Sequence, residues 1–334
     1  MGKIYYDKDA NIKYLKGKTI GIIGYGIQGR AQALNMRDSG MKVLVANRRD
    51  RYASRAKKDG FRVYDIAGLG KKSDVILFLI PDQAQAAVYE NYLKDTMRPG
   101  SMLVFAHGYA LRYKTVKLRR DIDVALLAPR MPGHHIRKYF LKGGGVPAFI
   151  DVVHDATGNT LKKLLALAKA TGFTRAGVLR VDYKVETDLD LFTEQFLVAG
   201  IVKLIHTGFN TLTKECGYPA VPSLMELYAS GELAEVLKLA ATSGIGKAFQ
   251  ENASPTCQYG IADSFNKVFD DGLEATAKKI MRQIQDGSFS RRLGREGDSG
   301  YRTVRKLWNT VNSKSLIRAH DWISGSFKSE VKWV

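Results

Sequence analysis

Short apolar segments alternate with longer amphipathic segments over the first half of the chain. Six runs have the length and composition of buried strands, at 20–23, 43–46, 75–80, 102–106, 124–128 and 148–153. The segments between the early runs have helical spacing, over 29–39, 53–59 and 84–92. Continuous apolar strands separated by helices are typical of a parallel sheet covered on both faces. The pattern therefore predicts an α/β domain of Rossmann type, which we place at residues 1–181.

The spacing of apolar residues becomes helical from about Asp182 onward. A nearly all-apolar segment begins at Phe192 and predicts a long helix, buried at a domain or subunit interface. Later segments at 233–241 and 273–286 are also helical in pattern, and no stretch alternates as a strand does over a useful length. We therefore predict a mainly α second domain, residues 182–334.

A glycine-rich segment follows the first predicted strand directly and opens a helix. Its residues are Gly24, Tyr25, Gly26, Ile27, Gln28 and Gly29. The pattern GxGxxG is weak alone, because glycine turns are common. Between a strand and a helix, the first glycine permits a tight turn, the second lets the backbone approach a pyrophosphate, and the third allows close packing. The N–H groups that open the helix favour phosphate, so we expect a dinucleotide site here.

The residues after the second predicted strand indicate which dinucleotide binds. An NAD site usually has Asp or Glu there to hold the ribose 2′-hydroxyl. This chain has Asn47, followed by Arg48, Arg49 and Arg51. Guanidinium groups suit a 2′-phosphate, which favours NADPH. Two alternatives stay open: Asp50 could still reach a ribose, and the basic turn could be merely solvated.

Three acidic residues at the start of the second domain are spaced four apart. Glu186, Asp190 and Glu194 share one helix face, where like charges repel. Acids beside an apolar helix need a neutralising cation, and carboxylate oxygens suit Mg²⁺. The alternative explanation is that acids are stabilised by the dipole at a helix N-terminus.

Composition limits the classes of function. The 334 residues are about two domains long. The net charge of +19 is spread along the whole chain and no nucleic-acid-binding signature is present, which disfavours a nucleic-acid partner. Cys216 and Cys257 make neither a disulfide framework nor a zinc motif. No apolar run approaches the roughly 18 residues of a membrane span and the N-terminus has no signal core, so we expect a reduced, cytoplasmic protein.

Specific motifs extend over nearly the whole chain. They are GYGIQGRAQALNMRDSG (24–40), IPDQ (80–83), AHG (106–108), APRMPGHHIR (128–137), GGGVPAFIDVVHDATG (143–158), TDLDLFTEQ (187–195), ECGY (215–218), the segment 254–260 and IQDGSF (284–289). Together they resemble the ketol-acid reductoisomerase family of branched-chain amino-acid synthesis, in its short form.

This resemblance implies a knotted helical second domain that forms a homodimer or a larger homo-oligomer. It also implies two Mg²⁺ ions and NADPH, which act on a small 2-acetolactate-type substrate. An alkyl group migrates between adjacent carbons, and hydride transfer then gives a 2,3-dihydroxy acid.

The resemblance assigns roles to individual residues. Asp190 matches the acid that bridges the metals, Glu194 a further metal ligand, and Glu226 an acid of the second metal contributed across the dimer. His107, at the carboxyl end of a strand, matches an active-site histidine, and Ser254 a residue that contacts the substrate carboxylate. The residues placed at NADPH, by motif or by resemblance, are Gly24, Tyr25, Gly26, Ile27, Gln28, Gly29, Arg48, Arg49, Arg51, Ser54, Asp82, Gln83, Ala84, Gln85 and Gly133.

Two positions depart from the family pattern. The family has lysine where this chain has Arg130, whose guanidinium is essentially never neutral. A role in moving a proton would be lost there, while a role in orienting the metal-bridging carboxylates would survive. The family also has a glutamate four residues after Glu226, where this chain has Ser230, then Gly231 and Glu232. Glu232 replaces that ligand only if Gly231 interrupts the helix.

Several functions stay open beside the one we favour, a working ketol-acid reductoisomerase with an altered second metal site. One is a diverged member that reduces or rearranges a different 2-keto acid with an incomplete metal site. A dehydrogenase of the 6-phosphogluconate or β-hydroxyacid type has a similar plan, but the motifs at 187–195 and 284–289 lie outside the shared Rossmann part. An NADPH-binding protein without activity is disfavoured, because Asp190, Glu194, His107 and Ser254 are all present.

Overall fold

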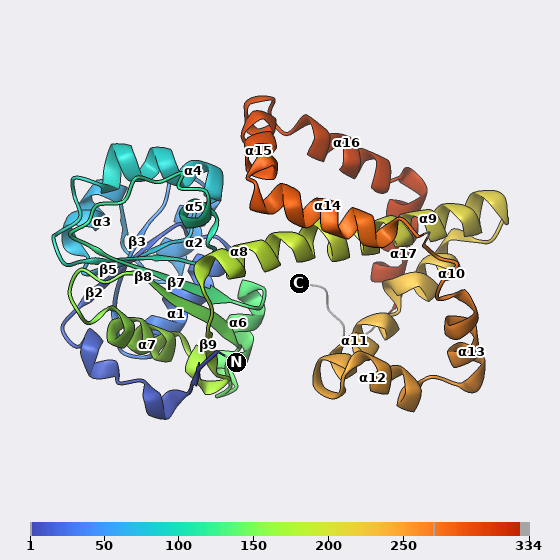
Figure 1. Ribbon diagram of the computed structural model, residues 1–334, viewed down its shortest axis with the longest axis horizontal. Coiled ribbons are helices and arrows are strands. Elements are labelled where there is room, and N and C mark those ends of the chain that lie inside the picture. Colours follow the sequence, from blue (N-terminus) through green and yellow to red (C-terminus); the bar gives the residue numbers. More distant parts are fainter. Residues whose placement is uncertain (1, 270, 328–334) are drawn as a thin grey trace. The chain divides into compact units, whose positions relative to one another are not determined.

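The computed structural model describes residues 2–269 and 271–327, and it forms two compact units, Met1–Asp190 and Leu191–Val334 (Figure 1). Within the described residues, the first unit contains a nine-stranded sheet. Its strands are β1 (Ile4–Tyr5), β2 (Thr19–Ile23), β3 (Lys42–Ala46), β4 (Val63–Tyr64), β5 (Val75–Phe78), β6 (Met102–Phe105), β7 (Asp123–Pro129), β8 (Ala148–His154) and β9 (Val178–Arg180). Its helices are α1 (Ile27–Asp38), α2 (Arg51–Lys58), α3 (Ile66–Lys72), α4 (Asp82–Val88), α5 (Tyr109–Arg112), α6 (Gly133–Leu141), α7 (Thr160–Thr171) and most of α8 (Tyr183–Phe192).

The order of the strands is β1-β9-β8-β7-β6-β5-β2-β3-β4. The six predicted strands are all present, and the Rossmann-type sheet is confirmed. One part of the prediction is wrong, because β8 runs antiparallel to β7. The N–H of Arg130, after the end of β7, donates to the carbonyl of Pro147, before the start of β8. Strand β8 therefore begins beside the end of β7 and runs back along it. Strands β1, β4 and β9, which have two or three residues each, were too short to be predicted.

Alternate residues of the central strands face opposite sides of the sheet, as the pleat requires. Ile20 and Ile22 of β2 pack with residues of α1 and α7, whereas Ile23 packs with Leu69 of α3 on the other side. Both faces are therefore buried, which explains why these strands are apolar along their whole length rather than alternating.

The second unit is helical throughout its described residues, as predicted. Its helices are α9 (Ala199–Asn210), α10 (Ala220–Leu224), α11 (Glu232–Ser243), α12 (Ile245–Asn252), α13 (Pro255–Ser264), α14 (Leu273–Gln285), α15 (Ser288–Asp298), α16 (Arg302–Val311) and α17 (Lys314–Ser326), with π-helical turns at Thr193–Val198, Thr211–Glu215 and Met225–Ala229. A small core joins α9, α10 and α17 through Phe209, Leu224 and Leu316.

One helix runs without a break from Tyr183 to Glu215. An 18-residue window of it has a mean hydropathy of 1.3, and only 6% of that window is buried within the chain. By length and composition it passes the test for a membrane span, which the sequence analysis did not anticipate, although core helices of soluble proteins also pass this test. Contacts within one chain therefore do not give this helix the burial that was predicted for it.

A buried polar network lies beneath the glycine-rich segment. The Tyr25 side chain is fully buried, its ring meets Phe61 edge-on, and its hydroxyl donates to Asp59 Oδ2 over 2.9 Å. Arg30 donates to both oxygens of the same carboxylate. The hydrogen bond from Arg30 holds the pKa of Asp59 below its usual range, and burial together with Asp59 raises the pKa of Tyr25 well above its own. The network fixes the end of α2 against the start of α1.

Removal of the Tyr25 hydroxyl tests this network. We predict that Tyr25→Phe lowers the free energy of unfolding by about 1.5–3 kcal/mol, the value typical of a hydrogen bond to a charged group. Urea denaturation followed by circular dichroism measures the loss. Tyr92→Phe is the matched control, because Tyr92 is exposed. Equal losses in the two variants would show that the buried hydroxyl has no special role.

Candidate functional site

The glycine-rich segment forms a tight turn between β2 and α1. Gly24 has φ +96°, in the left-handed region that favours glycine, and a Cβ there would overlap the carbonyl of Leu79. A Cβ on Gly29 would overlap the carbonyl oxygen of Gly24. Gly26, in contrast, has nothing within 4 Å of a built Cβ. The turn therefore closes tightly on the protein side and leaves Gly26 open, which is the geometry that a bound pyrophosphate needs.

The segment containing Arg130 lies directly beside this turn. Gln28 donates to the carbonyl of Met131 over 3.1 Å. Gly133, the first residue of α6, would overlap the carbonyl of Ile27 if it carried a Cβ. The predicted cofactor loop and the predicted catalytic segment are thus in contact. The side chain of Tyr25 points into the core, and its backbone N–H donates to Asn47 Oδ1 over 2.9 Å.

The carboxylate of Asp50 is occupied within its own loop. It caps α2 by accepting from the N–H groups of Tyr52 and Ala53, and it also accepts from Asn47 Nδ2 and from Arg48 Nε, both over 2.9 Å. The hydrogen bond from Arg48 holds the pKa of Asp50 below its usual range. This acid is therefore not a free acceptor for a ribose hydroxyl.

Basic and polar groups of the same loop are exposed. Arg48 has a side chain that is 87% exposed. Arg51 stacks on Tyr52 and donates to its hydroxyl over 3.0 Å. Within the described residues Arg49 makes no ion pair, and the hydroxyl of Ser54 makes only a long contact, 3.5 Å, to the carbonyl of Asp50. Three guanidinium groups thus surround the end of β3.

The buried carboxylate of Glu186, on α8, is a second feature of this edge of the sheet. Its side chain is fully buried, Oε2 accepts from the N–H of Gly108 over 2.9 Å, and Oε1 lies 3.4 Å from Arg130 Nη1. Burial raises the pKa of Glu186, while the charges of His107 and Arg130 and the Gly108 N–H oppose the rise. In the sequence this acid stands out only as one of a spaced set, and no local signal assigns it a role in the site.

Asp190 lies one helical turn beyond Glu186 and meets two cationic side chains. Its Oδ1 accepts from Arg130 Nη2 over 2.8 Å, and its Oδ2 lies 3.5 Å from His107 Nε2. The guanidinium of Arg130 also stacks over Phe149, 5.1 Å from the ring centroid. One planar guanidinium therefore joins Glu186 and Asp190, through Nη1 and Nη2 respectively.

His107 follows β6 and is held between two carboxylates. Its Nδ1 lies 3.2 Å from Asp82 Oδ2, and its Nε2 faces Asp190. Burial lowers the pKa of His107, but the hydrogen bond and charge of Asp82, with the charges of Glu186 and Asp190, outweigh burial and raise it to about 9. Asp82, which was predicted among the NADPH residues, has its side chain in contact with His107, and no sequence signal revealed this contact.

The remaining predicted acids and the serine belong to the second unit. Glu194 is exposed on the π-helical turn at 193–198, and Glu226 is exposed on that at 225–229. Ser254 caps α13, where its hydroxyl accepts from the N–H of Cys257 over 3.2 Å. Gly231, at φ +88°, interrupts the helix, and Glu232 begins α11. The interruption that a replacement ligand requires is therefore present. Among the described residues no three His, Cys, Asp or Glu side chains gather as a metal site.

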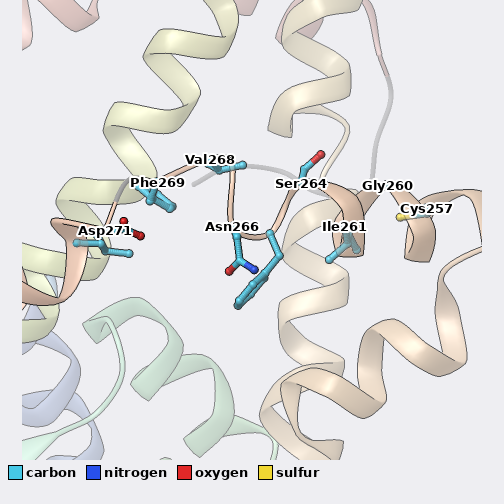
Figure 2. Close-up of a pocket in the computed structure, with 10 residues that line it drawn as sticks. Cys257, Gly260, Ile261, Ser264, Asn266, Val268, Phe269 and Asp271 are labelled. Atoms are coloured by element: carbon cyan, nitrogen blue, oxygen red, sulfur yellow. The ribbon is translucent and has the colours of Figure 1, made fainter.

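An apolar hollow of about 840 Å³ opens beside α13 in the second unit (Figure 2). Ile261 of this helix, Phe265, Val268 and Phe269 contribute apolar side chains, and Phe265 is 75% exposed. None of the residues predicted for catalysis lines the hollow.

Comparisons with known proteins agree with this arrangement. Residues 14–177 match the family described as acetohydroxy acid isomeroreductase, NADPH-binding domain, and residues 183–325 match ketol-acid reductoisomerase, C-terminal domain. The chain belongs to the ketol-acid reductoisomerase family. The resemblance seen in the sequence is thus confirmed, and the chain is a member of a family of oxidoreductases and isomerases.

Relatives of this ketol-acid reductoisomerase family member match over almost their full length. The ketol-acid reductoisomerase (NADP(+)) of Caldivirga maquilingensis is 38% identical, covering 95% of both chains. That of Pyrobaculum aerophilum is 40% identical, covering 95% of this chain and 96% of the relative. A solved NADH-preferring ketol-acid reductoisomerase from an uncultured archean has a TM-score of 0.92 at 30% identity, covering 98% of this chain and 100% of that one.

The ion pairs of Arg130 with Glu186 and Asp190 can be tested through the stability of variants. We predict that Arg130→Met lowers the free energy of unfolding by about 3–5 kcal/mol, because it removes the guanidinium that pairs with the buried Glu186. Adding Glu186→Gln should recover part of the loss, since the orphaned charge is then removed. Urea unfolding of the two single variants and the double variant gives the coupling.

Arg120→Met is the control for this cycle, because Arg120 is exposed and makes no ion pair within the described residues. Strictly additive losses from the two single changes at 130 and 186 would contradict the ion pair.

Proposed function

We propose that this chain is an NADPH- and Mg²⁺-dependent ketol-acid reductoisomerase that converts 2-acetolactate-type substrates to 2,3-dihydroxy acids in branched-chain amino-acid synthesis. One observation carries the proposal. His107, Arg130 and Asp190, from three different elements, converge beside the glycine turn in a single unit. A hydride donor bound at the turn would therefore lie next to the groups that orient a substrate.

The choice of NADPH rests on the loop after β3. The curated relatives are named for NADP(+), whereas the solved relative is NADH-preferring, so the family alone leaves the cofactor open. In this chain Asp50 is occupied, partly by Arg48 Nε, and Arg49 makes no ion pair within the described residues. Arg48 and Arg51 keep further guanidinium N–H groups for a ligand beside their contacts to Asp50 and Tyr52. Guanidinium groups without a free acid favour a 2′-phosphate. The backbone of 24–29, the segment 82–85, Ser54 and Gly133 complete the proposed cofactor site.

We propose that Mg²⁺ is held by Asp190, Glu194 and Glu226. These carboxylates supply the hard oxygen donors that Mg²⁺ prefers, and the side chain of Asp190 is partly exposed. The hydrogen bond from Arg130 occupies Oδ1 of Asp190, so a bound ion would share the charge of this acid with a guanidinium. Gly231 frees Glu232 to act as a further ligand. When bound, Mg²⁺ would polarise the hydroxyl and carbonyl oxygens of the substrate.

The protein's own residues then have distinct tasks. Arg130 keeps Asp190 and Glu186 in one orientation and, being always charged, does not move a proton. His107 presents Nε2 toward Asp190, at the place where a substrate hydroxyl would lie. Ser254, whose hydroxyl proton remains free to be donated while its oxygen caps α13, would bind the substrate carboxylate.

We propose a homodimer or larger homo-oligomer, in which a second copy covers the exposed apolar face of the helix at 183–215. Leu197, Val198, Ile201 and Leu204 are 36–55% exposed on this helix, and the hollow beside α13 adds further apolar surface. Burial of such surface favours association. The proposal assigns residues 1–181 to cofactor binding and residues 182–334 to metal binding and dimerisation. It also includes a knotted second domain, a role for Glu226 across the dimer, and a cytoplasmic location.

One observation favours a second candidate function. Arg130 Nη2 already donates to Asp190 Oδ1 over 2.8 Å, which leaves this acid one oxygen fewer for a metal. A member whose metal site is incomplete would still reduce a 2-keto acid, because hydride transfer needs only cofactor and orientation. The alternative is therefore a diverged reductase that does not perform the alkyl migration.

The cofactor assignment is tested at Arg49. We predict that Arg49→Ala raises the Kd of NADPH about tenfold, the loss of one charge-assisted hydrogen bond, and leaves the Kd of NADH within about twofold. Fluorescence titration with both dinucleotides measures the two values. Lys57→Ala, on the exposed side of α2, is the control. An equal weakening of both dinucleotides would argue against a 2′-phosphate at this loop.

The reaction is tested by following NADPH oxidation with 2-acetolactate, with and without Mg²⁺, beside a 2-keto acid that needs no migration. We expect turnover of acetolactate that is lost on chelation with EDTA and restored by Mg²⁺. Turnover of the 2-keto acid alone would replace the proposal with the diverged reductase. Tight NADPH binding without any oxidation would contradict both enzymes.

A further inference from the structure

The imidazole of His107 has carboxylates on both of its nitrogens. Asp82 Oδ2 lies 3.2 Å from Nδ1, and Asp190 Oδ2 lies 3.5 Å from Nε2. The two acids come from different elements, Asp82 from the first turn of α4 and Asp190 from α8. A ring fixed at Nδ1 can present only Nε2 to whatever is bound beside Asp190.

The carboxylate of Asp82 is itself fixed. Its Oδ1 accepts from Gln85 Nε2 over 3.2 Å, and the same amide nitrogen donates to the carbonyl of Ile80 over 3.1 Å. Gln85 is buried, and Pro81 begins the helix with its restricted backbone. The chain Gln85–Asp82–His107 therefore runs from a buried amide to the ring, and each member limits the freedom of the next.

We propose that Asp82 is the positioning residue of His107: its side chain sets the orientation of the ring for the reaction under "Proposed function", on which this inference rests, rather than binding the dinucleotide. The backbone of Asp82 is not used by this chain of contacts, because the hydrogen bonds to His107 and Gln85 involve only the Asp82 side chain. A carboxylate behind a functional histidine commonly fixes its tautomer and orientation.

The experiment compares Asp82→Ala with Asp82→Asn. The asparagine keeps an acceptor oxygen for Nδ1, whereas alanine removes it. We expect Asp82→Ala to lower kcat about 10–100-fold, as for loss of an outer carboxylate. The KM for acetolactate and the Kd for NADPH should stay within about twofold, because neither ligand touches the carboxylate. Asp82→Asn should recover most of the lost kcat.

Asp65→Asn provides the matched control. Asp65 is also an acid at the start of a short helix, where it caps α3 through the N–H of Gly68, but it does not contact His107. If kcat fell as far in this variant as in Asp82→Ala, then any change of an acid at a helix start would lower kcat. That result would overturn the proposal.

A readout without turnover separates this inference from the proposed function. The ring nitrogens of His107 are assigned in ¹⁵N NMR spectra by the signals that vanish in His107→Gln. Asp82→Ala should shift the Nδ1 resonance, and Asp82→Asn should restore it part of the way. If the native protein has no acetolactate turnover, the proposed function fails while the spectra still test the orientation. Unchanged ring signals, or a rise in the NADPH Kd with kcat unchanged, would overturn the role of Asp82.

Discussion

The burial of one negative charge organises the catalytic edge of the first unit. Transfer of a carboxylate into a protein interior costs several kcal/mol unless it is paired and hydrogen-bonded. Glu186 is fully buried, and it is compensated by the N–H of Gly108 after β6 and by Arg130 after β7. The start of α8 is therefore tied to the ends of two neighbouring strands. Because Asp190 lies one turn further along the same helix, its place beside His107 follows from where Glu186 is anchored.

The anchoring of Glu186 also shows which groups neutralise the spaced acids. Their spacing indicated that a cation must neutralise them, and Mg²⁺ was the expected one. In the first unit the neutralising groups are Arg130 and His107, both supplied by the chain. The proposed metal site therefore depends on the exposed carboxylates of Glu194 and Glu226 and on the oxygens of Asp190, and less on the repulsion between neighbours along the helix.

The features that could be predicted are those that depend on adjacent residues. The long apolar strands and the turn at Gly24–Gly29 were recognisable because strand burial and left-handed backbone leave local signatures. The direction of β8 was not, since it depends on where α6 returns the chain. The pairing of Asp82 with His107 joins residues 25 positions apart, and nothing local marks it. The interruption of the helix at Gly231 was only partly predictable, because glycine permits a helix break but does not impose one.

The same physical rule separates the acids of the site by function. A carboxylate that protein donors already satisfy is structural, and one that remains open is available to a ligand. Asp50 is used by the N-terminus of α2 and by Arg48, so the loop around it presents guanidinium groups. Asp82 is used by His107 and Gln85, and Glu186 by Gly108 and Arg130. Asp190 lies between these two cases, because Arg130 donates to its Oδ1 while its Oδ2 faces His107. By pairing with Glu186 as well, the guanidinium of Arg130 holds the two acids together before any ion binds.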